Sequence, residues 1–133
     1  MRTTAVLLVP ALLVACTSAP PYPAYAIEDD AEAIAQVVVM DVTLQDVIRA
    51  GRPRVERVTP DNYLRVLVPL RNIDDEPIQV LAQMEFLDEQ RVALSDLTNR
   101  QVVQIPSGGT HHFEALSRDP RAADFVLRLG WDK

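Results

Sequence analysis

The histidine side chains are the first groups of this sequence that could bind a metal ion, and their spacing argues against it. His111 and His112 are adjacent, in a segment with the alternating pattern of a strand. Neighbouring residues of a strand point to opposite faces, so these two imidazoles cannot readily bind one ion. A zinc site also needs three or four converging ligands. We therefore predict no metal and no cofactor, with one histidine half-buried and the other solvated.

The serines that could act as nucleophiles beside these histidines are Ser95, Ser107 and Ser117. None of the three lies in the Gly-x-Ser-x-Gly pattern of a nucleophile elbow. The consecutive acids at 74–76 precede Pro77, which is typical of a solvated turn. They do not form the loop of alternating Asp residues with a distal Glu that binds calcium. These patterns predict a protein that is not an enzyme.

The single cysteine, Cys16, has the most specific chemical context of any residue. A positive charge at Arg2 precedes an uninterrupted apolar run over 5–15. As a helix this run would span ~16 Å, against ~30 Å for the hydrocarbon core of a bilayer. It therefore fits the apolar core of a secretory signal rather than a transmembrane helix. The run leads into Leu-Val-Ala-Cys at 13–16, which resembles the bacterial lipobox, although a chance cysteine after an ordinary secretory signal remains the alternative.

The lipobox resemblance implies a signal peptide over 1–15 and a mature chain that begins at Cys16. The cysteine thiol would carry a thioether-linked diacylglycerol, and several acyl chains together attach a protein to a membrane effectively permanently. The next residue is Thr17, whereas Asp at this position retains a lipoprotein in the inner membrane under enteric-type sorting. The resemblance therefore implies a palmitoylated lipoprotein on the periplasmic face of the bacterial outer membrane.

Length and charge limit the remaining function classes. The chain has 133 residues, which suffice for one domain. Its 13 basic residues are outnumbered by 19 acidic ones, which gives a net charge of -6, whereas nucleic-acid binding needs a basic face. Aromatic residues make up 5% of the chain, which leaves few platforms for stacking bases. We predict no nucleic-acid partner.

The first part of the mature chain predicts a tether. Residues 17–26 are proline-rich and lack aliphatic periodicity, which is typical of a semi-extended linker about 30 Å long. Residues 27–36 are acidic and Ala-rich, and predict a loose segment or a short helical turn. We therefore assign the lipidated cysteine and a flexible tether to 16–36, and the folded domain to 37–133.

Apolar and polar residues alternate with a period of two along the folded domain, which predicts β-strands. The clearest alternation covers 63–72 and 78–88; in the second segment the core-facing residues are Ile78, Val80, Ala82, Met84 and Phe86. Turn signals separate about seven short strands, and no convincing helix lies between them. We therefore predict an all-β fold, an antiparallel immunoglobulin-like β-sandwich. The other expected strands are 37–47, 54–58, 100–105, 110–116 and 125–131.

One row of outward-facing residues is a candidate partner-binding surface. Tyr63, Arg65 and Arg71 share the outward parity of the strand at 63–72, and arginines can pair bidentately with an anionic partner. The same row is equally compatible with an ordinary solvated sheet face. Three leucines also have the outward parity of their strands: Leu67, Leu81 and Leu87. Exposed leucines in these positions would indicate an interface, unless the N-terminal segment covers them.

The order of these segments resembles the YcfL-like family, small envelope lipoproteins whose domain is of unknown function. The resemblance rests on Leu-Arg-Val-Leu-Val-Pro-Leu-Arg-Asn at 64–72, Pro-Ile-Gln-Val at 77–80, Met-Glu-Phe-Leu-Asp at 84–88, Ile-Pro-Ser-Gly-Gly at 105–109 and Ala-Asp-Phe-Val-Leu-Arg-Leu at 123–129. The family often has Trp in place of Phe86, and it favours Gly in the turn that reads Asp-Glu-Gln-Arg here. It occurs beside a lipoprotein activator of peptidoglycan synthases in some genomes, which implies an envelope context.

These expectations favour a non-enzymatic, membrane-anchored lipoprotein that binds another periplasmic protein. The alternatives are a binding module for cell-wall glycan or a small ligand, a secretion-system anchor lipoprotein, and a hydrolase. A hydrolase needs a triad, metal set or carboxylate pair that this sequence does not assemble. A glycan module would show exposed aromatic residues on one sheet face, where this chain offers mainly Tyr63 and Trp131, and Trp131 has core parity.

Overall fold

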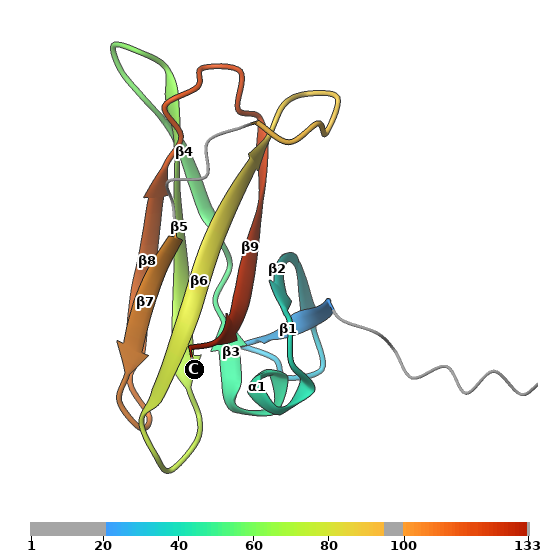
Figure 1. The fold of residues 1–133 in the computed structure, drawn as a ribbon, viewed down its shortest axis with the longest axis vertical. Coiled ribbons are helices and arrows are strands. Elements are labelled where there is room, and N and C mark those ends of the chain that lie inside the picture. Colours follow the sequence, from blue (N-terminus) through green and yellow to red (C-terminus); the bar gives the residue numbers. More distant parts are fainter. Residues whose placement is uncertain (1–20, 95–99, 133) are drawn as a thin grey trace, which may run out of the picture.

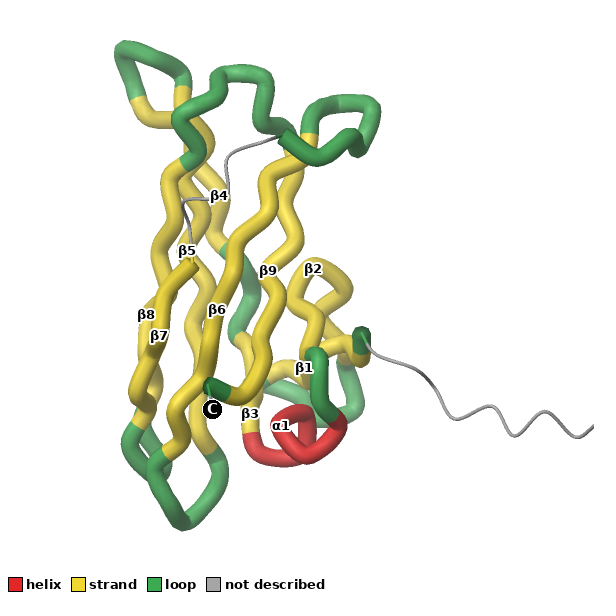
Figure 2. Tube along the Cα trace, viewed as in Figure 1, coloured by secondary structure: helices red, strands yellow, loops and turns green. Residues whose placement is uncertain are grey.

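The computed structural model describes residues 21–94 and 100–132. Within these ranges the chain forms nine strands and one short helix (Figures 1 and 2), so the predicted all-β class is confirmed. The helix α1 is Val42–Val47. The strands are β1 (Tyr22–Ala26), β2 (Ala33–Val39), β3 (Ile48–Ala50), β4 (Arg54–Val58), β5 (Tyr63–Asn72), β6 (Ile78–Leu87), β7 (Arg100–Ile105), β8 (Thr110–Leu116) and β9 (Asp124–Trp131).

One sheet curls over on itself and makes two layers (Figure 1). In the first, the β5 layer, β5 pairs with β8 along one edge and with β4 and β3 along the other. In the second, the β6 layer, β6 lies between β7 and β9, and β9 also pairs with β2. β1 joins the two layers because it pairs with both β2 and β3.

The predicted antiparallel arrangement of about seven strands is wrong in two respects. β1 runs parallel to β3, and β2 runs parallel to β9, so the sheet is mixed. The described residues also contain two strands that the alternation did not reveal, β1 with five residues and β3 with three. The three residues of β3 are too few to show a two-residue period, and β1 lies in a proline-rich stretch that suggested a linker.

The predicted tether over 16–36 is too long, because residues from Tyr22 onward belong to the sheet. Ala24 and Ala26 of β1 are buried, as is Ile34 of β2. Pro23, which suggested a linker, lies beside the shift in the β1–β2 register, where a residue without an N–H is tolerated. The folded domain therefore begins at 22 rather than at 37.

Residues 42–47 form α1 rather than the second half of a strand. The Asp41 side chain caps the helix: its Oδ1 accepts hydrogen bonds from the Thr43 backbone N–H at 2.9 Å and from the Thr43 hydroxyl at 2.6 Å. Leu44, one turn along, is fully buried. The Asp-x-Thr cap therefore ends the strand, which alternation alone continued through to Val47.

Core packing follows the predicted parity in most strands. The five core-facing residues of β6 are all buried, and the fully buried Phe86 lies opposite Phe125 in the β6–β9 register. In β2 the buried residues are Val37 and Val39, and Met40, just beyond the strand, is 42% exposed.

The predicted signal peptide over 1–15, Cys16 and Thr17 lie outside the described residues. The expectations for the lipid anchor therefore stay predictions. Across 21–94 and 100–132, no helix is long and apolar enough to cross a membrane.

Candidate functional site

The row predicted to bind a partner lies along the outer face of β5. Tyr63, Arg65 and Arg71 are half-buried or exposed, while the residues between them alternate into the core. The two arginines are six positions apart, which puts them about 20 Å apart along the strand. The three side chains therefore share a face but do not form one compact site.

Arg65 is not a free cation for an anionic partner. Its Nε lies 3.2 Å from Glu56 Oε1 on β4 and 3.0 Å from Glu114 Oε1 on β8. The N–H is not aligned for a hydrogen bond with either carboxylate, so the attraction is that of an ion pair. The side chain is 39% exposed. Two acids from the flanking strands thus balance its charge, which the sequence did not reveal.

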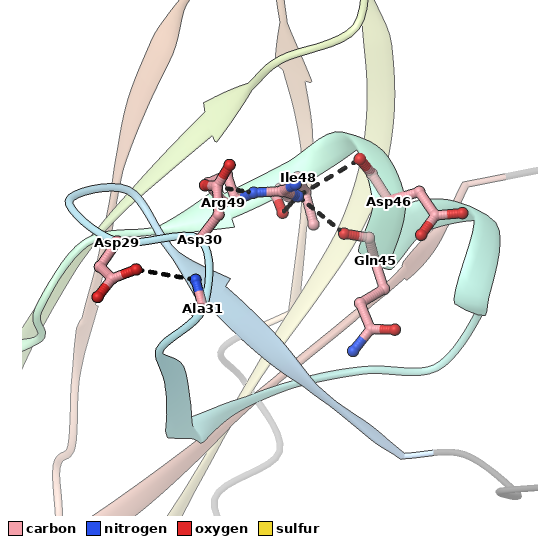
Figure 3. Close-up of polar contacts among 7 residues, drawn as sticks. All are labelled: Asp29, Asp30, Ala31, Gln45, Asp46, Ile48 and Arg49. Carbon is pink, nitrogen blue, oxygen red and sulfur yellow. Dashed lines mark hydrogen bonds and ion pairs between the residues drawn. The ribbon is translucent and has the colours of Figure 1, made fainter.

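Arg71, at the other end of β5, lies opposite Arg49 of β3. Arg49 is held in place by several groups (Figure 3): its Nε is 3.0 Å from Asp30 Oδ1, and its Nη1 donates to the carbonyl oxygens of Gln45 and Ile48. Its guanidinium also lies 5.2 Å from the centre of the Tyr25 ring. Arg49 therefore satisfies carbonyl groups at the end of α1, a structural role that the sequence pattern does not reveal.

A polar hollow lies at the opposite end of the molecule, between three loops at the top of Figure 1. These loops are the β4–β5 turn, the turn after β6 and the β8–β9 connection. The space has a volume of about 430 Å³. We call it the loop-end hollow, and its lining residues are Arg57, Asn62, Asp88, Glu89, Gln90, Pro120, Arg121 and Ala123.

The turn after β6 is held by Asp88. Its Oδ1 accepts hydrogen bonds from the backbone N–H groups of Gln90 and Val92, each at 2.9 Å. Arg91 takes a φ of 62°, the left-handed conformation that glycine adopts most readily. Its Nη1 lies 3.0 Å from Asp124 Oδ2 on β9. The turn therefore keeps the glycine-type geometry without a glycine.

The β8–β9 connection is ordered by hydrogen bonds from its own side chains. The buried Ser117 hydroxyl accepts from the Asp119 N–H at 3.1 Å. The Asp119 carboxylate in turn accepts from Nε and Nη2 of Arg121, at 3.1 and 2.8 Å. Ala122 is fully buried beneath them. These hydrogen bonds and the buried Ala122 side chain thus hold the β8–β9 connection in place, and Arg121 lines the hollow.

The Arg121 guanidinium lowers the pKa of the Asp119 carboxyl below its ordinary value, chiefly through the side-chain hydrogen bonds. The same hydrogen bonds raise the pKa of Arg121. Both groups therefore stay charged at neutral pH. The rim of the hollow combines cations at Arg57 and Arg121 with acids at Asp88 and Glu89.

The sequence signals for these loops are local, so they do not show that the loops meet. The β4–β5 turn has the sequence Thr-Pro-Asp-Asn at 59–62, which is typical of a turn, and Asn62 takes a φ of 60°. Of the predicted partner-binding residues, Tyr63 lies next to the hollow in the chain. Arg71 lies nine residues beyond Asn62, about 30 Å along the strand.

Among the described residues, the candidate nucleophiles Ser107 and Ser117 form no hydrogen bond with a histidine. The Ser107 hydroxyl donates to the Asp74 carbonyl oxygen at 2.7 Å, and Ser117 is fully buried. Ser95 lies outside the described residues. His111 is half-buried and His112 exposed on β8, as the sequence predicted. In the described part of the chain, no group of three or more His, Cys, Asp or Glu side chains could hold a metal ion.

Two solved structures are similar to this chain. The crystal structure of Campylobacter jejuni cj0090 has a TM-score of 0.61 and 22% sequence identity, and the match covers 74% of this chain and 100% of that one. A DUF1425 family member from Shewanella sp. pv-4 has a TM-score of 0.56 and 11% identity, covering 62% of this chain and 75% of that one. No family model and no curated protein matches the sequence. The comparisons therefore show a fold that also occurs in small bacterial proteins.

Proposed function

We propose that this protein is a non-enzymatic lipoprotein, anchored through Cys16 to the periplasmic face of the bacterial outer membrane, and that its loop-end hollow binds another protein of the cell envelope. The anchor follows from the lipobox-like sequence Leu-Val-Ala-Cys at 13–16. The binding site follows from the position and the chemistry of the hollow.

The observation that carries the binding proposal is the separation between the hollow and the anchored end of the domain. Near the N-terminal strand, α1 contacts the C-terminal end of β5, since the Ile73 N–H donates to the Val47 carbonyl oxygen at 2.9 Å. The hollow includes Asn62, just before β5 begins. The ten residues of β5 thus place the hollow about 30 Å from α1. A partner can reach it without competing with the tether.

The lining of the hollow suits a protein partner. Small-molecule sites are mostly apolar, with a few polar groups. Here charged and amide side chains from three loops surround the space, with apolar contributions from Pro120 and Ala123. Exposed loops on a rigid sandwich are common positions for protein recognition. Side chains of both charge signs can meet complementary charges on a partner surface.

The non-enzymatic assignment is supported by the environment of the candidate nucleophiles. Ser107 donates its hydroxyl proton to a backbone carbonyl, and Ser117 is buried within the β8–β9 loop. Neither is paired with His111 or His112 by a hydrogen bond in the described residues.

The resemblance to the YcfL-like family adds a cellular context to this proposal. That family occurs beside a lipoprotein activator of peptidoglycan synthases in some genomes, so a partner linked to peptidoglycan synthesis is the first to test. A glycan-binding module is less well supported, because the two aromatic candidates lie in different layers. Tyr63 is on β5, whereas Trp131 ends β9 and donates its indole N–H to the Thr43 hydroxyl at 2.9 Å.

Site-specific photo-crosslinking in intact cells tests the binding site. A photo-reactive residue at Gln90, in the hollow, should form an adduct with one envelope protein. The same residue at Thr110, exposed at the far end of β8, should not. Arg57→Ala should abolish the Gln90 adduct, because Arg57 lines the hollow. Equal adducts at both positions, or an adduct that survives Arg57→Ala, would show that the partner binds elsewhere.

A further inference from the structure

An apolar row crosses the outer face of the β6 layer from β2 to β7. Leu81 of β6 lies opposite Gly130 of β9 on one side and Val102 of β7 on the other. Met40 continues the row beyond Gly130, because its N–H donates to the Leu129 carbonyl oxygen at 2.8 Å. Met40 is 42% exposed and Val102 is 55% exposed. We call Met40, Gly130, Leu81 and Val102 the apolar row.

A shallow hollow of about 220 Å³ lies over Gly130, between Met40 and Leu81. A Cβ atom at residue 130 would meet nothing within 4 Å. The backbone there also does not require glycine, since Gly108 is the glycine with positive φ in the described residues. Neither packing nor backbone conformation therefore explains the missing side chain, which leaves an open apolar depression in the row.

The surroundings of the row carry little net charge, although the chain as a whole is acidic. Next to Leu81 on β6, the outward neighbours are the uncharged amides Gln79 and Gln83. Arg128 of β9 pairs with Glu85 of β6, so this charged pair is already neutralised. Two further charges beside these amides have opposite signs: Arg100 lies opposite Gln83, and Asp132 accepts a hydrogen bond from Gln79. The face is therefore suited to contact a surface that has an apolar interior and carries no net charge.

The start of the described chain brings this row close to the proposed anchor. Tyr22, the first residue of β1, pairs with Val39, the residue before Met40. Cys16 precedes Tyr22 by six residues. Fully extended, these six residues reach at most about 20 Å. Because β1 and β2 belong to the sheet, the tether cannot hold the domain as far from the membrane as a tether to residue 36 would.

We infer that the apolar row seats the domain on the lipid bilayer surface to which Cys16 is anchored, an inference that rests on the proposed lipid anchor. Met40, at the tether side, and Val102, at the far side, mark the two ends of the contact. Asp88, at the rim of the loop-end hollow, follows the last residue of β6 and is seven positions from Leu81, about 23 Å along the strand direction. A bilayer under the row therefore leaves the loop-end hollow accessible to a protein partner.

Spin labelling of the full lipidated protein in phosphatidylcholine vesicles tests this orientation. Acylation blocks the native thiol of Cys16, so a nitroxide attaches only at an introduced cysteine, Met40→Cys or Val102→Cys. Val55→Cys is the matched control, because Val55 is also an exposed valine, on β4 of the other layer. We expect the labels at 40 and 102 to lose accessibility to a water-soluble nickel chelate and to gain accessibility to oxygen. The label at 55 should stay accessible to the chelate.

A second pair of variants tests the apolar row by a substitution away from the labelled position. Leu81→Gln should return the label at 102 towards water, whereas Leu67→Gln, at a half-buried leucine on the outer face of β5, should leave it unchanged. If the protein floats with the vesicles but positions 102 and 55 behave alike, the seating is wrong and the anchor stands. If spin–spin coupling shows two labels at 102 close together, a second copy covers the row and the inference is overturned. If the protein does not float with vesicles, both the anchor and the seating are wrong.

Discussion

The backbone N–H of Gly51 donates a hydrogen bond to the carbonyl oxygen of Pro69 at 2.8 Å, at the break between β3 and β4. Both backbone polar groups of a residue in an antiparallel strand point towards the same neighbour. The position of the missing N–H of Pro69 therefore faces this break and not β8. The strand accommodates a proline in its interior because two short partners leave a gap at that residue.

Gly51→Ala should destabilise the fold by about 1–3 kcal/mol, the usual cost of inserting an atom into a packed site. A Cβ at residue 51 would lie 2.8 Å from Cγ of the Pro69 ring and 3.0 Å from its Cβ. The double variant Gly51→Ala/Pro69→Ala removes the ring and should recover part of the loss in urea unfolding. Gly130→Ala is the control, since nothing lies within 4 Å of a Cβ there, and it should change stability by about 0.5 kcal/mol or less. Similar losses in the two single variants would contradict this explanation.

Phe86→Ala should lower the free energy of unfolding by about 3–5 kcal/mol, because the side chain is fully buried at the centre of the core. Glu85→Ala, one residue away, removes a partly exposed ion pair with Arg128 and should cost about 1 kcal/mol or less. Thermal unfolding followed by circular dichroism distinguishes the two. Equal shifts in the melting temperature would mean that the inward face of β6 is assigned incorrectly.

The Asp119 carboxyl should titrate below the ordinary Asp range in a pH series of carbon NMR spectra, because Arg121 hydrogen-bonds to its charged form. A lowered pKa in the folded state stabilises the fold above the ordinary Asp value. That contribution is lost as the pH falls through the lowered pKa. Arg121→Ala should move the titration of Asp119 upwards, whereas Arg118→Ala should leave it in place. An unchanged titration in Arg121→Ala would remove the assigned cause.

The parts of the fold that could be predicted are those in which one physical signal repeats many times. β5 and β6 each have ten residues, so the alternation of buried and exposed positions defines their parity clearly. β3 has three residues and offers almost no period. α1 was missed because its apolar residues continue the strand pattern, while the decisive group is the Asp41 side chain that caps it.

The functional surface was less predictable, because it depends on residues that are distant in the sequence. Arg65 looked available from its own strand, yet Glu114, which balances its charge, is 49 positions later in the chain. Asn62 and Gln90 lie in turns 28 positions apart in the chain, and the curl of the sheet brings their loops to one end. In the turn at 88–91 the missing glycine was misleading, since Arg91 adopts the positive φ that the family's glycine would favour.

The chemical state of Cys16 in the protein isolated from its native membranes tests the account most directly. Mass spectrometry of the N-terminal peptide should show a mature chain that begins at Cys16, with a diacylglyceryl group on its sulfur. The Cys16→Ser variant should lose this modification and leave the membrane fraction or stay unprocessed. A mature protein with an unmodified Cys16 thiol, or a Cys16→Ser variant that fractionates with the outer membrane as the parent does, would contradict the lipid anchor on which the proposed function depends.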